Sequence, residues 1–213
     1  MIYRLLLGLT FLLSFNNVGA QSTPNVVVSI KPIHSIVTSL MEGVSRPQLL
    51  LESSDSAHTF HLKPSQLKLL SNADLVITIG DGFETGLKKT LGNIKDGSHI
   101  VTSEIDGLYL YHFRNADTNE MDKDEKDEHT DNDLHLWLDI DNMEKTAEYI
   151  SEQLIKIDSN NSNTYKSNLV IIHSRLNKLK SELQQQLTPL RSERYAIFSD
   201  TLQYFEKSFH FNK

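Results

Sequence analysis

The 213-residue sequence contains no cysteine. Its absence excludes disulfides, thiolate metal sites and cysteine nucleophiles, and it also excludes lipid attachment at an N-terminal cysteine. The net charge is −7, and the sequence has neither a basic cluster nor a glycine-rich phosphate loop, so nucleic-acid binding is not expected. No His-Glu-x-x-His or Gly-x-Ser-x-Gly motif is present, so the common zinc-hydrolase and serine-hydrolase signatures are absent too.

Long apolar runs are absent after residues 1–20, and that first segment has the pattern of an export signal. Arg4 precedes an apolar run from Leu5 to Leu13, and small residues occur in Val18-Gly19-Ala20. The run is too short to span a bilayer, which takes roughly 20 residues. We therefore expect cleavage near Ala20 and a mature chain that begins near Gln21 and is free in the periplasm, not a lipoprotein.

Strand and helix patterns alternate along residues 21–140. This alternation predicts an N-terminal α/β lobe with a mostly parallel sheet covered on both faces. In such folds ligands bind beyond the carboxyl ends of the strands, and His58 follows the second predicted strand. The predicted strands are Val26–Ile30, Gln48–Leu51, Ala73–Gly80 and Ile100–Thr102, and the predicted helices are Ile33–Met41, a segment starting near Pro64, and Phe83–Leu91.

Residues 141–190 have the apolar spacing of two helices. The second, from about Asn163 to Leu187, would be about 37 Å long. That length exceeds a single small lobe, so we expect this helix to connect two lobes. Tyr195–Phe198 predicts a new strand, and residues 191–213 are interpreted as the start of a truncated second lobe.

Acidic side chains concentrate in residues 115–133. From Asp117 to Asp133 there are nine acids, two lysines and one histidine, His129. Apolar side chains are nearly absent, so nothing drives packing there. We expect a solvated surface loop that attracts cations weakly, because one histidine among loosely held carboxylates is too poorly organised for tight binding.

Two histidine-bearing segments are the strongest indication of function. His58 and His61 occur in Ala57-His58-Thr59-Phe60-His61-Leu62, and His135 occurs in Leu134-His135-Leu136-Trp137. Imidazole is the commonest metal ligand at neutral pH, and two histidines brought together by the fold predict a metal site. Each also has a plainer interpretation: His58 as a capping or surface residue, His135 as a packing residue at a lobe edge, and His61 as a surface residue.

Five short segments occur in order along the mature chain: Val28-Ser29-Ile30-Lys31-Pro32-Ile33-His34-Ser35, His58–Ser65, Asn72–Val76, His135–Leu138 and Tyr204–Phe209. Each motif is modest by itself, but five in register are specific. Together they make the chain resemble the zinc-binding substrate-binding proteins of ABC transporters, the ZnuA-like branch of the cluster A-I metal-binding family.

The resemblance implies two α/β lobes joined by a long rigid helix, with the metal held in the cleft between them. It also implies an acidic loop before the second metal histidine, as residues 115–133 would be. Delivery of the metal to the membrane permease of an ABC importer, driven by a cytoplasmic ATPase, is implied as well. We further expect a monomer.

The resemblance implies His58 and His135 as metal ligands. A third family histidine would fall where this chain has Ser199, and a serine hydroxyl is a poor zinc ligand beside imidazole. Asp200 is the nearest substitute, and His61 is a second auxiliary candidate. The family's final acidic ligand would fall after residue 213, so the chain is interpreted as a fragment or a truncated product.

The favoured function is therefore non-enzymatic capture of Zn²⁺ for import. Mn²⁺ is an alternative cargo, because manganese favours carboxylate oxygens and one histidine is missing. A metallohydrolase-like envelope enzyme is an alternative from another class, and it would need an open water position and a nearby general base. A truncated protein with weakened metal binding is the last alternative.

Overall fold

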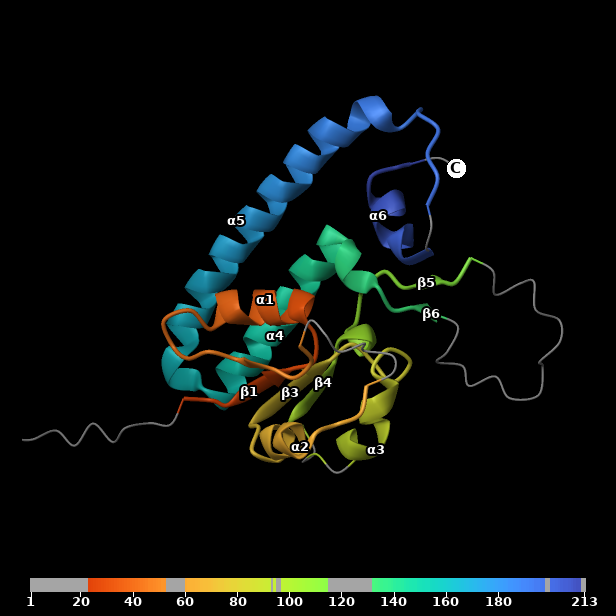
Figure 1. The fold of residues 1–213 in the computed structure, drawn as a ribbon. Coiled ribbons are helices and arrows are strands. Elements are labelled where there is room, and N and C mark those ends of the chain that lie inside the picture. Colours follow the sequence, from red (N-terminus) through yellow and green to blue (C-terminus); the bar gives the residue numbers. More distant parts are fainter. Residues whose placement is uncertain are drawn as a thin grey trace, which may run out of the picture.

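Four parallel strands form the centre of the first lobe (Figure 1). The computed structural model describes residues 23–52, 60–92, 94, 97–114, 132–197 and 200–211. The strand order is β2-β1-β3-β4, so the chain moves from the central strand β1 to one edge and then crosses to the other side. The strands are β1 (Val26–Val28), β2 (Gln48–Leu49), β3 (Leu75–Thr78) and β4 (His99–Val101).

Helices cover both faces of this sheet, as the alternating pattern predicts. Figure 1 shows α1, α4 and α5 on one side and α2 and α3 on the other. Pro32 and Pro64 occupy the first turns of α1 and α2, where a missing N–H breaks no helical hydrogen bond. The helices are α1 (Lys31–Leu40), α2 (Pro64–Ser71), α3 (Lys88–Leu91), α4 (Ile140–Ile157) and α5 (Ser162–Leu187).

The core of the lobe lies between the sheet and these helices. Every residue of β1 and β3 is buried, including Val27 and Ile77 at 0% exposure. Helix α1 adds Ile33, Val37 and Leu40, which recur at helical spacing. Continuous apolar runs are typical of strands buried on both faces of a parallel sheet, and these runs form such strands here.

Helix α5 leaves the lobe after about half of its length. Only Tyr165 and Ile172 of its 26 residues are buried, and Figure 1 shows its second half rising away from the sheet. Polar pairs with α4 continue past the apolar contact: Asn177 donates to Glu144 at 2.8 Å and Lys180 pairs with Asp141. The predicted long helix is confirmed, and its free-standing half extends toward the C-terminal segment.

A short antiparallel hairpin and a short helix form the region beside α5. Strands β5 (Tyr111–His112) and β6 (Asn132–Asp133) pair, and α6 (Gln203–Ser208) lies near them (Figure 1). Residues 115–131 of the predicted acidic loop lie outside the described residues. Asn132 and Asp133, the last two residues of the predicted loop, instead form strand β6, because they pair with β5.

One-turn 3-10 helices connect several of these elements. They are η1 (Thr85–Leu87), η2 (Thr102–Glu104), η4 (Leu136–Leu138), η5 (Ser159–Asn161), η6 (Thr188–Leu190) and η7 (Asp200–Leu202).

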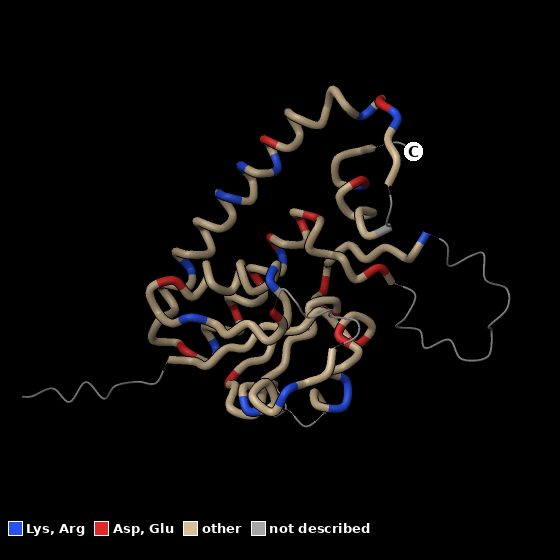
Figure 2. The backbone as a smooth tube through the Cα atoms, in the orientation of Figure 1, with Lys and Arg blue, Asp and Glu red and all other residues tan. Residues whose placement is uncertain are grey.

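Two expected elements differ from the structure. Residues 195–197 of the expected strand Tyr195–Phe198 form no strand, because no described strand lies beside them to complete a ladder. The expected helix at Phe83–Leu91 starts two residues later, as η1 and then α3, since Phe83 and Glu84 turn back onto the sheet. Within the described residues no helix is both long and apolar enough to cross a membrane. Lys and Arg (blue) and Asp and Glu (red) are intermixed along the described chain (Figure 2).

Candidate metal centre

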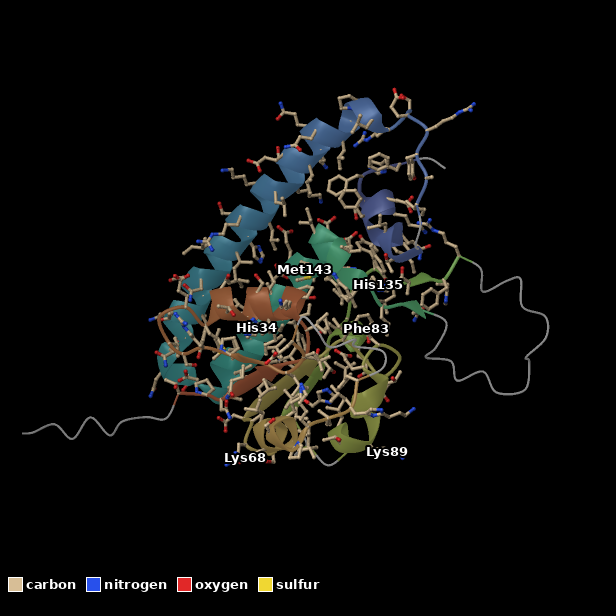
Figure 3. The ribbon with its side chains drawn as sticks, in the orientation of Figure 1. His34, Lys68, Phe83, Lys89, His135 and Met143 are labelled. Carbon is tan, nitrogen blue, oxygen red and sulfur yellow. The ribbon has the colours of Figure 1, made fainter. Side chains whose placement is uncertain are left out.

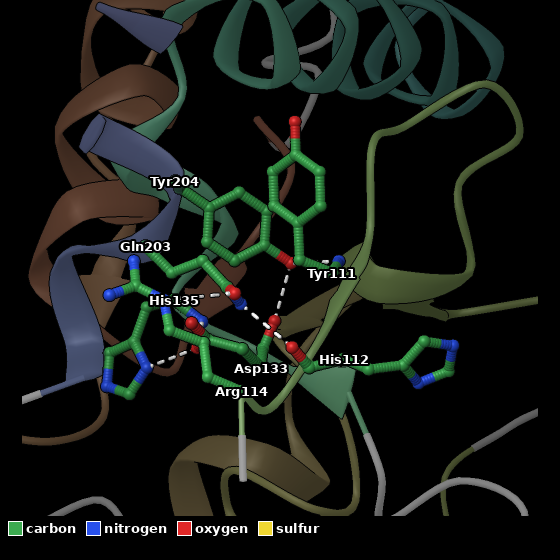
Figure 4. Close-up of polar contacts among 7 residues, drawn as sticks. All are labelled: Tyr111, His112, Arg114, Asp133, His135, Gln203 and Tyr204. Carbon is green, nitrogen blue, oxygen red and sulfur yellow. Dashed lines mark hydrogen bonds and ion pairs between the residues drawn. The ribbon is translucent and has the colours of Figure 1, made fainter. Parts of the chain in front are cut away.

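His135 lies where strand β6 turns into η4. The carboxylate of Asp133 holds it, with Oδ1 accepting from the His135 backbone N–H at 3.0 Å and lying 2.7 Å from the ring Nδ1 (Figure 4). Asp133 is 2% exposed and His135 is 17% exposed by side chain. A carboxylate at Nδ1 selects the tautomer with its proton there, so Nε2 is the nitrogen that can bind a metal.

Aromatic rings fix the other faces of the His135 imidazole. Phe83 meets it edge-on, with ring centroids 5.5 Å apart at 88°, and Trp137 lies 5.2 Å away at 57°. Phe83 and Trp137 also contact each other edge-on at 5.2 Å. This apolar shell limits ring rotation and keeps water from most of the imidazole, which strengthens ligation. Figure 3 shows Phe83 and His135 at the junction between the sheet and α6.

Phe83 is itself positioned by its neighbour Glu84, at the carboxyl end of β3. The Glu84 carboxylate accepts from the backbone N–H of Ile79 and of Gly80, each at 2.9 Å, and from the Ser29 hydroxyl after β1. Glu84 is 1% exposed, and burial raises its pKa although these hydrogen bonds oppose the rise. It therefore ties the ends of β1 and β3 together next to Phe83 in the chain. Glu84 is the N-cap residue of η1, but its carboxylate makes no capping hydrogen bond to that turn.

Phe60, the first described residue after His58, lies against Gly86 of η1. His58 lies outside the described residues, but Phe60, two residues later, is 8% exposed and belongs to the core. A Cβ on Gly86 would lie 2.5 Å from the Phe60 carbonyl oxygen, so only glycine permits this close approach of the chain to η1. His61, the auxiliary candidate, is exposed.

The remaining predicted ligand lies at the start of η7. The backbone of Asp200 begins that turn, but its side chain and the whole of Ser199 lie outside the described residues. Among the residues that are described, no group of three or more metal-binding side chains gathers. The ligand set of His58, His135, His61 and Asp200 therefore stays a prediction.

Asp133 belongs to this candidate site, although its sequence context does not mark it as a site residue. It was counted as the last acid of the loop, whereas the structure buries it and aims it at His135. The signal in the sequence is the Asp-x-His spacing of Asp133-Leu134-His135. When a turn begins at the histidine, the carboxylate two positions earlier can contact its Nδ1.

The family model described as zinc-uptake complex component A, periplasmic, matches residues 26–213. The chain belongs to this family. It is 29% identical over 239 aligned positions to the high-affinity zinc uptake system protein ZnuA of Brucella abortus, covering 98% of this chain and 72% of the relative.

Solved structures of the same architecture agree. A crystal structure of ZnuA superposes with a TM-score of 0.72 at 25% identity, over 89% of this chain and 68% of that one. A manganese-bound periplasmic metal-binding protein from Candidatus Liberibacter asiaticus superposes with a TM-score of 0.69 at 18% identity, over 88% of this chain and 66% of that one, and shares the fold.

Family membership confirms several expectations. The α/β fold with a parallel sheet and a long helix is confirmed, and the second lobe is incomplete in this sequence, which covers 68% of the solved ZnuA chain. The protein is a zinc-binding solute-binding protein of a periplasmic uptake system. Members of this family are transport components, so the expectation of a non-enzymatic protein is confirmed.

Proposed function

We propose that this protein captures Zn²⁺ in the periplasm and delivers it to the membrane permease of an ABC importer. The observation that supports the proposal is the Asp133–His135 pair, in which a buried carboxylate lies 2.7 Å from Nδ1 and leaves Nε2 available to a metal. A carboxylate–histidine–zinc arrangement orients the ring and raises its basicity. Members of the family serve zinc uptake, which supports zinc as the cargo.

The proposed ligands are His58 and His135, with His61 or Asp200 as auxiliary ligands. Both principal histidines would lie beyond the carboxyl ends of the strands, where α/β folds bind ligands. Because Ser199 occupies the position of a family histidine, the proposed site has one imidazole ligand fewer. Mn²⁺ is the second candidate cargo for that reason, since a site completed by the Asp200 carboxylate would suit manganese better than one with three imidazoles.

The proposed domain organisation follows the same scheme. Residues 1–20 are an export signal cleaved near Ala20, without lipid attachment. Residues 21–140 form the first lobe with its acidic loop at 115–133, residues 141–190 form the helix pair that includes the inter-lobe helix, and residues 191–213 begin the second lobe. The protein acts as a monomer.

Calorimetric titration of the metal-stripped chain from Gln21 with Zn²⁺ and with Mn²⁺ tests the proposal. We expect one-to-one zinc binding that weakens as the pH falls, because imidazole binds metal only in its neutral form. His58→Ala and His135→Ala should each lower the affinity by more than the roughly 10–100-fold typical of losing an outer-shell partner. His112→Ala is the matched control, because this histidine is exposed on β5.

Three results of this titration would overturn parts of the proposal. Absence of zinc binding by a folded chain would reject metal capture and favour a weakened family member. Tighter binding of Mn²⁺ than of Zn²⁺ would replace the cargo. Equal losses in His112→Ala and His135→Ala would reject the ligand assignment. Delivery is tested by zinc-limited growth of cells that carry the permease, with and without His135→Ala.

A further inference from the structure

We infer that Tyr204, on helix α6, is a positioning residue for His135, so that the first helix of the second lobe sets the orientation of a metal ligand in the first. The inference rests on the proposed metal role of His135. It assigns Tyr204 no contact with the metal. Tyr204 acts through the backbone of Asp133 and thereby through the carboxylate that holds the imidazole.

The Tyr204 hydroxyl bridges the two strands of the hairpin. It accepts a hydrogen bond from the Tyr111 backbone N–H at 3.2 Å and donates one to the Asp133 carbonyl oxygen at 2.5 Å (Figure 4). Tyr111 and Asp133 are direct partners in the antiparallel ladder. The hydroxyl of α6 thus joins the ladder at the residue pair that carries the carboxylate of the metal centre.

From that point a continuous series of hydrogen bonds reaches the imidazole. The Asp133 carbonyl is fixed by Tyr204, and the Asp133 carboxylate contacts both the backbone N–H and the Nδ1 of His135. Asp133 is 2% exposed by side chain, so water does not substitute for these partners. A displacement of the Asp133 backbone therefore moves the carboxylate relative to the ring and weakens the selection of the Nδ1–H tautomer.

Other contacts hold α6 on the hairpin independently of this hydroxyl. Gln203 donates to the His112 carbonyl oxygen at 2.9 Å, and Arg114 forms an ion pair with Glu206. The ring of Tyr204 is 0% exposed and packs against the Tyr111 ring, with centroids 4.9 Å apart. Removal of the hydroxyl alone should therefore leave α6 docked, which separates positioning from docking.

The hydroxyl stays protonated over the pH range in which the protein binds metal. Burial raises the pKa of Tyr204 to about 12. It can therefore donate to the Asp133 carbonyl at every pH at which imidazole is a ligand, and zinc binding should show no added pH dependence from Tyr204.

The test compares Tyr204→Phe with Tyr165→Phe. Tyr165 is also 0% exposed, and its hydroxyl donates to Asp158 at 2.7 Å at the far end of α4. Zinc affinity is measured by calorimetry, and the His135 tautomer is measured by nitrogen-15 NMR of the metal-free chain. We expect Tyr204→Phe to lower zinc affinity about three- to tenfold, less than the roughly 10–100-fold of a direct outer-shell partner, and to raise the population protonated at Nε2.

The control should lose comparable thermal stability with no change in affinity or tautomer. Equal affinity losses in both variants would mean that Tyr204 acts only through general stability, which would overturn the inference. If the wild type binds zinc and Tyr204→Phe changes neither the zinc affinity nor the His135 tautomer, the inference is also overturned. If the wild type does not bind zinc, the proposed function itself fails.

A double-mutant cycle and one wild-type measurement complete the test. In an Asp133→Asn background, Tyr204→Phe should lower the affinity by less than in the wild type, because both act through one carboxylate; additive losses contradict the inference. Coupling is reciprocal, so zinc should slow hydrogen exchange of the Tyr111 amide, which donates to Tyr204. Unchanged exchange on zinc saturation would overturn the coupling even if Tyr204→Phe failed to fold.

Discussion

The four-stranded sheet and helix α6 both support His135, but different contacts hold the two regions in place. The sheet is buried by continuous apolar runs, and Val26, Val27, Val28 and Ile77 are all 0% exposed. Helix α6 is attached to the hairpin by side-chain hydrogen bonds and an ion pair as well as by the contact between the Tyr204 and Tyr111 rings. Apolar burial is insensitive to small shifts, whereas hydrogen bonds fix directions. The sheet therefore supplies stability, and the polar contacts of α6 supply orientation.

The largest expected effect lies in the sheet. Ile77→Ala should lower the free energy of unfolding by about 2–5 kcal/mol, because it leaves a cavity in a fully buried strand. Urea unfolding of the metal-free chain measures this change. Ile171→Ala on α5, where the side chain is 47% exposed, is the matched control and should stay within about 0.5 kcal/mol. Similar losses at both positions would contradict the assignment of the core.

The second effect lies in the attachment of α6. Arg114→Met removes the ion-pair partner of Glu206, which is 7% exposed by side chain. The Glu206 carboxylate keeps the hydrogen bond from the Tyr195 hydroxyl at 2.7 Å, so losing its charged partner should cost about 1–3 kcal/mol. Hydrogen exchange should accelerate in α6 and not in β3, because the loss affects local opening. Lys88→Met is the control, since its pair with Asp81 at 3.9 Å is exposed and contributes little. Faster exchange throughout β3 would show that the two regions unfold together.

A smaller effect is expected where the two regions meet at Asp139. Its carboxylate accepts from the Asn142 N–H at 2.9 Å, as the N-cap of α4, and from the Ser208 hydroxyl of α6 at 2.5 Å. Asp139→Ala should destabilise the chain by about 1 kcal/mol, typical of a lost N-cap. Ser208→Ala keeps the cap and should cost less, as thermal unfolding of both variants can measure. Equal costs would mean that the cap contributes nothing beyond the contact with α6.

The smallest expected effect concerns Glu84 and the pH dependence of the free energy of unfolding. Because burial raises its pKa above 4.5, the folded chain keeps a proton that the unfolded chain releases. This contribution to stability is complete below pH 4.5 and is lost as the pH rises through the raised pKa. The stability of the wild type relative to Glu84→Gln should therefore fall with rising pH in urea unfolding, and a rise would contradict the assignment. Glu152→Gln, at an exposed position of α4, should show no such trend.

Local patterns predicted the elements whose determinants are local. The apolar run at Val26–Ile30 contains β1, and the helical spacing from Asn163 to Leu187 agrees with α5 to within one residue at its start. Pro64 marks the first turn of α2. Each of these signals needs only neighbouring residues, because burial on both faces of a strand or one face of a helix imposes a fixed period.

Elements that need a distant partner could not be predicted in this way. Strand β6 exists because β5 pairs with it. Residues 195–197 have a strand-like sequence, but no strand among the described residues pairs with them. Asp133 had the composition of a solvated loop residue. Its role depends on burial and on a 2.7 Å contact with His135, neither of which composition reports.

By itself the sequence determined the absence of disulfides, the α/β alternation, the long helix and the resemblance that made His58 and His135 candidate ligands, because residue identity and spacing carry that information. The tertiary structure alone decided which nitrogen of His135 faces the Asp133 carboxylate and which groups hold the ring in place. Asp133, Phe83 and Tyr204 come from three separate segments. Hydrogen-bond direction and ring contact are properties of assembled neighbours, so only the folded chain defines them.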